Sequence, residues 1–417
     1  MFRWPAAGRT RLAYLAALLL LAAVRLAPIV AANFPLGDGG LLTVMARDLR
    51  ANGFALPAFT SYNDGSIPFV YPPLGAYILA LIPGDPIQTE RWLPLLYSLM
   101  AAGAAWLLAA ELAGRRIAAV ALLAFVSMPV TWAIEGGGVT RGLGFALLLV
   151  ALWRAAVLLR SPTVRNAVLA GVPFGLALLS HPSVGPTGVA SAILFLAFRP
   201  SWRGALLLTA GAGLAALIVL PWLLTVLSVH GPGPLLLGIG AHAQQPALVR
   251  LLTFGPSWLG PLDPILPASI IGAAVAIRRE GWLVPAWLAL LVVVPGGDGR
   301  FAALAWAILA GYGAAFTFEA LRSIQAERWA AVMGVAVLLV ASWIASYQLF
   351  QPVSADTRAA MLSGPITPTE EDDPAVEWYP ALTGRASPIV YFGYEWTTTW
   401  GERLGAYERA LRACGCS

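Results

Sequence analysis

The chain has 417 residues, of which 59% are hydrophobic and only 11% are charged, and its mean hydropathy is +0.75. Soluble domains carry about 25% charged residues, so this composition excludes an ordinary soluble protein and indicates that lipid is the solvent. The net charge of +5 does not indicate a nucleic-acid surface, because the 26 basic residues, all arginine, lie in short groups between apolar segments. That distribution is typical of membrane proteins, in which it fixes the orientation of the chain.

Eleven segments are apolar enough to be predicted as membrane-crossing helices. A crossing helix needs about 20 mostly apolar residues, since hydrocarbon offers no partner for unpaired backbone groups. In chain order the predicted spans are Leu12–Ala32, Trp92–Ala113, Ile117–Ile134, Gly142–Leu159, Asn166–Ser180, Ser183–Phe198, Gly204–Val229, Ser257–Ile277, Trp282–Pro295, Phe301–Ala320 and Arg328–Phe350. The predicted fold class is therefore an all-α polytopic membrane protein, with one transmembrane domain over residues 1–350.

The apolar segment Pro72–Pro83 is predicted not to cross the membrane. Its twelve residues are too few for a span and fit a re-entrant or interfacial helix. With the N-terminus in the cytoplasm, thirteen arginines then fall on the cytoplasmic face and six on the opposite loops of the membrane domain, as the positive-inside rule requires. If this segment crossed, every later loop would change sides and the bias would disappear. We therefore expect a multi-pass plasma-membrane protein with a cytoplasmic N-terminus and an extracytoplasmic C-terminal tail.

The predicted outer face carries most of the acidic side chains of the membrane domain. Its longest segment, residues 33–91, contains the amphipathic stretch Gly39–Asn52. We expect this stretch to form a short interfacial helix, because four of its apolar residues share one face: Leu42, Met45, Ala46 and Leu49. From Gln351 onward the composition becomes polar, so residues 351–417 are expected to form a small outer tail.

Asp38 is the first candidate for catalysis. It follows the first predicted span by six residues and stands in a Gly-rich turn before the amphipathic stretch. A carboxylate held at the membrane surface and partly desolvated can have a raised pKa and act as a general base. The alternative is a solvated aspartate with no chemical role, and the local sequence leaves both interpretations open.

The order of features resembles that of the C-type membrane glycosyltransferases, which include the aminoarabinose transferases and protein O-mannosyltransferases. In that family the first span leads to an outer loop with an acidic motif, then to an interfacial helix and a Pro-Pro-Leu segment. Here Asp38, Ala46-Arg-Asp-Leu49 and Tyr71-Pro-Pro-Leu74 follow one another, and Leu179-Ser-His-Pro182 is similar to the family's His-Pro at a later outer helix end. The resemblance covers about the first 200 residues. Gly39 stands where the family commonly has a second carboxylate.

This resemblance implies transfer of a sugar from a polyprenyl-phosphate donor to a glycan, lipid or protein acceptor at the outer face, with inversion. Asp38 would deprotonate the acceptor hydroxyl, and outward side chains would hold the departing lipid phosphate. The substrate-binding residues assigned in this way are Arg25, Asp48, Tyr71, Arg141, His181, Arg250, Asp298 and Arg300. No nucleotide or other cofactor is required, no residue is assigned to a metal, and a role for a divalent metal stays open.

Several of these assignments have a structural alternative. Arg25 lies inside an apolar span, where it either snorkels to the interface or binds a lipid phosphate. Arg141 either pairs with Glu135 across a Gly-rich outer turn or contacts substrate. Asp298 and Arg300 belong to a tight outer turn that is equally compatible with a structural role.

Two other functions remain as alternatives. A lipid or glycan transporter would line its path with ionisable side chains at mid-membrane depth; the clearly intramembrane charges here are Arg25 and Arg154, with no acid beside them. A catalytically inactive relative with the same fold is the second alternative, because Gly39 removes one carboxylate of the family's motif.

Overall fold

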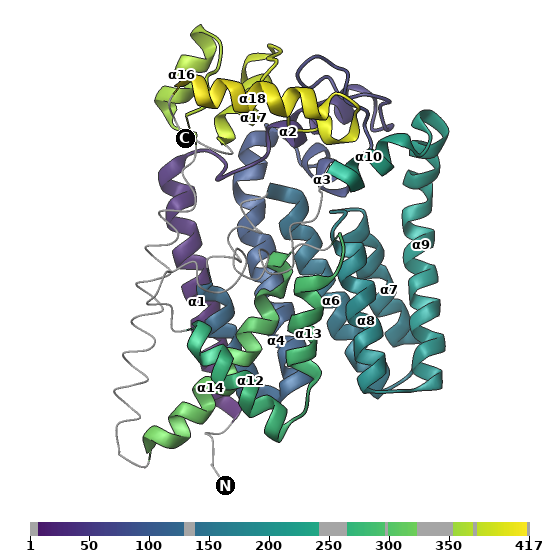
Figure 1. Cartoon of the computed structure of the whole chain (residues 1–417), viewed down its shortest axis with the longest axis vertical. Helices are drawn as coiled ribbons and strands as arrows, with labels where there is room; N and C mark the ends of the chain where they lie inside the picture. The colour runs from purple at the N-terminus through teal and green to yellow at the C-terminus, as the bar shows by residue number, and fades with distance from the viewer. Residues whose placement is uncertain are drawn as a thin grey trace.

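The computed structural model describes residues 7–128, 138–241, 265–296, 299–322, 353–369 and 373–414. Within these ranges the chain is helical and has no strand, apart from one isolated bridge between Phe59 and Pro68. Figure 1 shows long helices packed side by side beneath a layer of short helices, to which the first loop and the C-terminal tail both contribute. The architecture is therefore an apolar helical body with a cap at one end.

The body is formed by helices that coincide with most of the predicted spans. Four stretches within the described ranges are long and apolar enough to cross a membrane, at 86–127, 139–160, 202–230 and 299–321, and α7, α8 and α13 are shorter apolar helices. The predicted span Arg328–Phe350 lies outside the described residues, as does the first part of Ser257–Ile277, so the total of eleven stays a prediction. The body helices are α1 (Ala7–Ala32), α4 (Pro86–Ser127), α6 (Gly138–Arg160), α7 (Val164–Leu178), α8 (Val184–Phe198), α9 (Trp202–His230), α12 (Ile265–Arg279), α13 (Leu283–Val293) and α14 (Ala303–Arg322), the last preceded by the 3₁₀ turn η2 (Gly299–Ala302).

The predicted span Trp92–Ala113 and the described part of Ile117–Ile134 are joined within α4, and residues 129–134 lie outside the described residues. The helix is interrupted at Gly114, whose φ of 81° and ψ of 157° are not helical. Only glycine adopts this backbone conformation without strain, because it lacks a Cβ. The glycine before the paired arginines Arg115 and Arg116 therefore ends one predicted span and begins the next.

The end of the body opposite the cap gathers arginines from several loops around two acids. Glu111 contacts Arg160 at 3.2 Å and Arg199 at 3.3 Å. Glu319 contacts Arg116 at 3.0 Å and Arg279 at 3.3 Å. All four arginines were predicted to lie on the cytoplasmic face, and the structure brings them to one end of the molecule. Such partly exposed ion pairs add little stability. They show that the helix ends carrying these arginines lie at the same end of the body.

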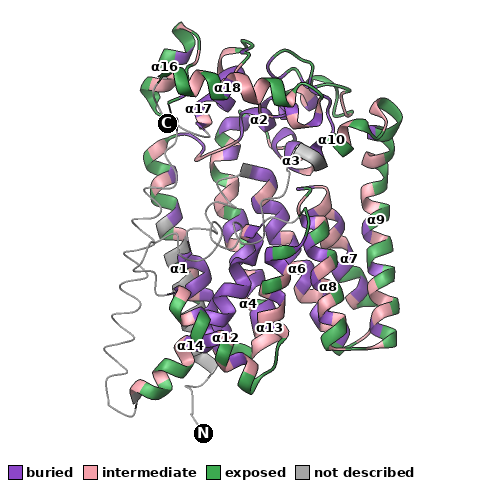
Figure 2. Cartoon of the chain, viewed as in Figure 1, coloured by how far each residue is buried: buried purple, intermediate pink, exposed green. Residues whose placement is uncertain are grey.

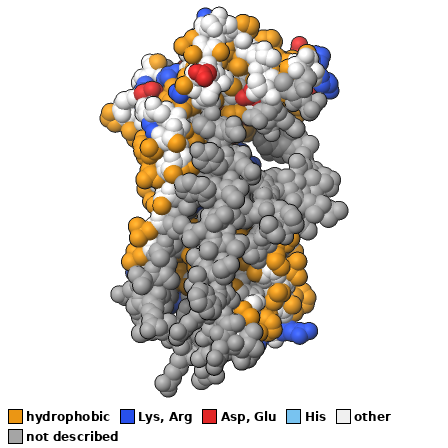
Figure 3. Space-filling view, turned by 90° about the vertical axis from the view of Figure 1, so that its left-hand side faces the viewer, with side chains coloured by type: hydrophobic (Ala, Val, Ile, Leu, Met, Phe, Trp, Pro, Cys, Tyr) orange, Lys and Arg blue, Asp and Glu red, His pale blue; other side chains and the backbone are white. Residues whose placement is uncertain are grey.

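Large apolar side chains cover the flanks of the body. Leu19 is 70% exposed, Ile193 62% and Leu217 65%, and Figure 2 shows α9 exposed or half-buried along most of its length. On the face drawn in Figure 3, hydrophobic side chains cover the described flanks, whereas the visible acidic ones gather at the capped end. An apolar belt of this kind needs lipid around it, because isolated soluble proteins expose much smaller apolar patches.

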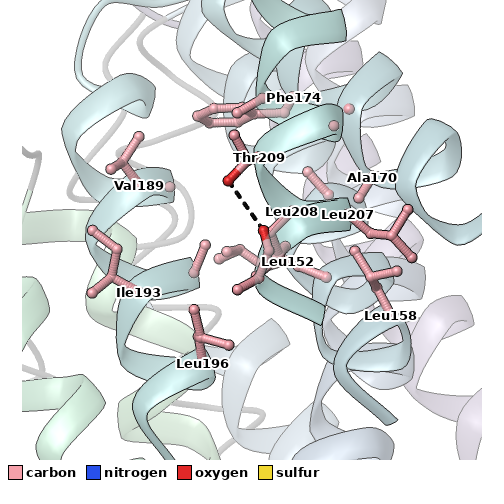
Figure 4. Close-up of a pocket in the computed structure, with 18 residues that line it drawn as sticks. Leu152, Leu158, Ala170, Phe174, Val189, Ile193, Leu196, Leu207, Leu208 and Thr209 are labelled. Atoms are coloured by element: carbon pink, nitrogen blue, oxygen red, sulfur yellow. Dashed lines mark hydrogen bonds between the residues drawn. The ribbon is translucent and has the colours of Figure 1, made fainter. Parts of the chain in front are cut away.

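Four of the body helices also border an apolar cavity, which opens between exposed side chains on the flank of the body. It has a volume of about 310 Å³ and is lined by α6, α7, α8 and α9 (Figure 4). The side chains that line it include Phe174, Ile193 and Leu208. Thr209 also lines it, and its hydroxyl donates a hydrogen bond within α9 to the Ala205 carbonyl at 3.1 Å. No charged residue lines this cavity, so it offers nothing that would bind a phosphate.

The cap joins the first loop to the tail in one apolar core. The predicted helix over 39–52 is present as α2, and its apolar face (Leu42, Met45, Ala46 and Leu49) is buried. It packs against the tail helix α17 and against α3. α3 has eight residues, which span about 12 Å, far less than the hydrocarbon thickness. The cap helices are α2 (Gly40–Ala51), α3 (Leu74–Leu81), α10 (Gly233–Ala241), α16 (Ala355–Ser363), α17 (Pro374–Thr383), η3 (Tyr394–Trp396) and α18 (Trp400–Cys414).

The tail is more than the small polar segment expected from its composition. Val376, Trp378 and Tyr394 are each 0% exposed, and they share a core with residues of the first loop. An ion pair between Arg403 and Asp64 also links tail and loop. A few well-spaced apolar residues are enough to bury one side of the tail helices, although the average composition is polar.

Candidate active site

Asp38 lies in the turn between α1 and α2, at the border of the cap and the body. Asp38 is half-buried. The backbone before it is fixed by the buried ring of Phe34, and the backbone after it by the first turn of α2. Its charge is close enough to raise the pKa values of Tyr71 and Glu377. Asp38 therefore acts on the interior groups of the cap and is not an isolated surface aspartate.

Tyr71 connects four parts of the chain at this border. Its hydroxyl forms a hydrogen bond with the Thr140 hydroxyl at 3.2 Å. Its ring meets the rings of His181 and Trp396 edge to face, with centroids 6.4 and 6.0 Å away. Burial raises the pKa of Tyr71 to about 12, the nearby charge of Arg141 lowers it, and the charge of Asp38 raises it. The loop before α3, the start of α6, the end of α7 and the tail thus converge around one phenol.

His181 is held at the same place by the turn between α7 and α8. The residue is 7% exposed, and its Nδ1 accepts a hydrogen bond from the Ser183 amide at 3.3 Å. In the neutral ring Nε2 then carries the proton. The imidazole also lies edge to face with Phe301, with centroids 6.4 Å apart, which places the η2 turn and its half-buried Arg300 beside this site.

Four of the residues predicted for the site are therefore brought together: Asp38, Tyr71, Arg141 and His181. Arg300 precedes Phe301, the ring that meets His181. Arg250 and Asp298 lie outside the described residues. Arg25 is buried within α1, at 3% exposed, and its Nη1 donates to the Val126 carbonyl at 3.4 Å. Its side chain therefore contacts the backbone at the end of α4.

Asp48 has a structural role in the folded chain. Its carboxylate accepts hydrogen bonds from the Thr60 hydroxyl at 2.7 Å and from the amide and hydroxyl of Ser61 at 2.8 and 2.6 Å. These bonds fix the loop that carries the bridge between Phe59 and Pro68. With its acceptor sites used in this way, Asp48 orders the loop leading to Tyr71.

Two acids that the sequence interpretation did not assign come from the tail: Glu377 lies close to Asp38, and the charge of Glu395, like that of Asp38, raises the pKa of Tyr71. Glu377 is 4% exposed, and burial, followed by the charge of Asp38, raises its pKa to about 8. Glu395 adjoins Trp396, and burial raises its pKa to about 7. No local pattern marks Glu377, whereas Glu395 stands in an aromatic stretch, Val390 to Trp396.

Glu90 fills the space beside Gly39. It is 1% exposed, and its Oε2 accepts from the Thr43 hydroxyl at 2.8 Å. A Cβ added to Gly39 would lie 2.4 Å from Glu90 Oε1, so the position has no room for a side chain. A carboxyl group from α4 therefore occupies the volume into which a second carboxylate at position 39 would project.

Residues 70–228 match the model of the dolichyl-phosphate-mannose-protein mannosyltransferase family. A comparison with curated proteins finds no match. ArnT from Cupriavidus metallidurans bound to undecaprenyl phosphate superposes with a TM-score of 0.60 at 15% identity, over 91% of this chain and 85% of that one.

A second similar structure is the oligosaccharyltransferase AglB from Archaeoglobus fulgidus, in complex with an inhibitory peptide and a dolichol-phosphate. Its TM-score is 0.60 at 14% identity, over 90% of this chain, and the present chain spans 64% of its length. The archaeal enzyme has also been solved with Zn and sulfate. Among the residues described here no group of three His, Cys, Asp or Glu side chains could hold a metal ion.

These comparisons agree with the family predicted from the order of motifs. The match over residues 70–228 begins just before Tyr71 and includes His181, and the structural similarity extends over nine tenths of the chain. At these low identities the similarity establishes the fold. The chain shares the fold of these two solved structures, and its residues 70–228 match the dolichyl-phosphate-mannose-protein mannosyltransferase family.

Proposed function

We propose that this protein transfers a sugar from a polyprenyl-phosphate donor to an acceptor at the outer face of the plasma membrane. The observation that carries the proposal is the convergence of Asp38, Tyr71, Arg141 and His181 where the cap meets the apolar body. A carboxylate and a guanidinium from distant segments act on the same phenol, close to the surface where a lipid headgroup would lie. The relatives solved with dolichol-phosphate and undecaprenyl phosphate support this donor class.

In the proposed reaction the acceptor oxygen attacks the anomeric carbon of the donor sugar. A new bond forms between that oxygen and the carbon, and the bond from the carbon to the phosphate oxygen breaks. The electron pair leaves with the polyprenyl phosphate, whose charge the guanidiniums of Arg141 and Arg300 stabilise. The acceptor proton passes to Asp38, which acts as the general base.

Replacing the proposed base tests this mechanism. We expect Asp38→Asn to insert and unfold as the native protein does, and to lose transfer by about 10²–10⁴-fold, the usual contribution of a general base. The assay uses protein reconstituted in liposomes with a panel of polyprenyl-phosphate sugars and follows release of the free polyprenyl phosphate. Asp356→Asn, an exposed aspartate in the first turn of α16, serves as the matched control and should leave turnover unchanged.

The assay also separates the alternatives. Native turnover by Asp38→Asn would refute the assignment of the base. A native protein that releases no polyprenyl phosphate from any donor, although it binds the donor, would support the inactive-relative alternative. Movement of intact lipid-linked sugar between leaflets without cleavage would instead support the transporter.

A further inference from the structure

The tail helix α17 presents two consecutive buried side chains to the Asp38 turn. α17 begins after Asp373, whose side chain accepts from the Ala375 amide at 2.8 Å, and Pro374 opens its first turn. Aspartate before a proline at the first helical position is a strong start signal. This start sets the register that places Glu377 and Trp378, 4% and 0% exposed, on the face toward α2.

These two side chains bind the backbone on both sides of Asp38. Glu377 Oε2 accepts from the Gly39 amide at 3.1 Å, and Oε1 accepts from the Leu41 amide at 3.2 Å. On the other side, Trp378 Nε1 donates to the Gly37 carbonyl at 2.8 Å. The turn that carries Asp38 is therefore held at residues 37, 39 and 41 by a segment more than 330 residues away in sequence.

The carboxylate of Glu377 replaces a cap that the sequence of α2 lacks. The N-cap residue Gly39 has no side chain to accept from the first amides of the helix, and such amides need a partner when they are buried. The close approach depends on Gly40, since a Cβ there would lie 2.5 Å from the Glu377 carbonyl oxygen.

Docking of α17 does not depend on the Glu377 carboxylate. Tyr62 donates to the Glu377 carbonyl at 2.6 Å, and Arg47 donates to the Ala381 carbonyl at 2.9 Å. The ring of Trp378 packs edge to face on Phe34, with centroids 4.8 Å apart. Removing the carboxylate alone therefore leaves the tail attached to the cap and frees only the turn around Asp38.

We propose that Glu377 is a positioning residue for Asp38, with Trp378 as its partner, so that the C-terminal tail forms part of the catalytic unit. This inference rests on the proposed role of Asp38 as general base. A base displaced by about 1 Å can lose about 10²-fold in rate. We therefore expect the loss of Glu377 to lower kcat strongly and to change the KM for the lipid donor little.

A graded series of variants in the full-length protein tests the proposal. Glu377→Gln keeps one acceptor oxygen, and Glu377→Met keeps the length of the side chain with no strong acceptor. Trp378→Phe removes the donor to Gly37 and keeps the ring against Phe34. Tyr379→Phe is the control on the same helix, because the Tyr379 hydroxyl donates to the tail carbonyl of Gly364 at 3.4 Å and does not touch the Asp38 turn.

Two measurements are made on each variant. Hydrogen exchange followed by mass spectrometry reports the amides of peptides covering residues 36–44 and needs no donor. We expect faster exchange there in Glu377→Met, an intermediate effect in Glu377→Gln, and native exchange in Tyr379→Phe. In liposomes kcat should fall about 100-fold in Glu377→Met, with partial recovery in Glu377→Gln.

The outcomes separate this inference from the proposed function. Native exchange over residues 36–44 in Glu377→Met, or a native kcat, would overturn the positioning role even if Asp38→Asn is inactive. Exchange that rises equally throughout the tail would overturn it as well, because it would show general loosening. In the Asp38→Asn background Glu377→Met should still accelerate exchange and should cost no further activity; a fully active Asp38→Asn protein refutes the base itself.

Discussion

Gly40→Ala should separate the tail from the Asp38 turn by a steric route, without removing any polar group. The added Cβ would lie 2.5 Å from the Glu377 carbonyl oxygen and 3.0 Å from Trp378 Cα. These are backbone atoms of α17, so no side-chain rotation relieves the contact. An ordinary contact needs about 3.4 Å or more, and α17 must therefore retreat from α2 by about 0.9 Å.

The energetic cost follows from that displacement. Overpacking of a well-filled core costs about 1–3 kcal/mol. The bonds from the Gly39 and Leu41 amides to Glu377 are already 3.1 and 3.2 Å long, and a retreat of this size breaks both, at about 1 kcal/mol each. The local free energy of opening of the cap should fall by about 3–5 kcal/mol.

Hydrogen exchange of the α17 and α2 amides in detergent measures this local opening. Gly401→Ala is the matched control, because a Cβ on this tail glycine meets nothing within 4 Å and alanine is favoured in a helix. Exchange of α2 and α17 in Gly40→Ala that is as slow as in the native protein would refute the tight backbone contact, and with it the geometry on which the positioning role depends.

Two further predictions concern acids of the site. Gly39→Ala should destabilise the protein, because the new Cβ would lie 2.4 Å from Glu90 Oε1. In a Glu90→Ala background this destabilisation should largely vanish. Equal destabilisation in both backgrounds, measured by thermal unfolding, would contradict this packing. Glu395 should make stability depend on pH. Burial raises its pKa in the folded protein from 4.5 to about 7, so the folded state holds the proton more tightly, and the contribution of Glu395 to the free energy of unfolding should fall as pH rises from about 4.5 to about 7 and stay level above. Glu395→Gln should remove that part of the slope in unfolding midpoints, and an unchanged slope would argue against desolvation of the Glu395 carboxyl group.

Sequence patterns located the body helices because the signal for a membrane helix is local. A run of about 20 apolar residues is sufficient to define a span, and α6, α9 and α14 lie where such runs were predicted. The helix over 39–52 was predicted from the spacing of its apolar residues, and α2 buries that face. The order of Asp38, the Pro-Pro-Leu segment and the His-Pro pair indicated the fold family before any contact was known.

The roles of individual polar residues were decided by tertiary contacts. Asp48 was assigned to substrate because it belongs to a family motif, but its carboxylate binds Thr60 and Ser61. No feature of its local sequence distinguishes these two roles, because the partners come from a loop whose path depends on the rest of the cap.

What the sequence by itself determined is the apolar body and the helix after Asp38; the base stays a proposal that the family resemblance suggested. Only the tertiary structure decided what surrounds that base. Glu377 reaches Gly39 across 338 residues of sequence, and Glu90 fills the space beside Gly39 from another helix. Whether a segment enters the membrane depends on its own length and hydrophobicity, which can be read from the local sequence. The position of a carboxylate in the site depends instead on which distant segments of the chain meet.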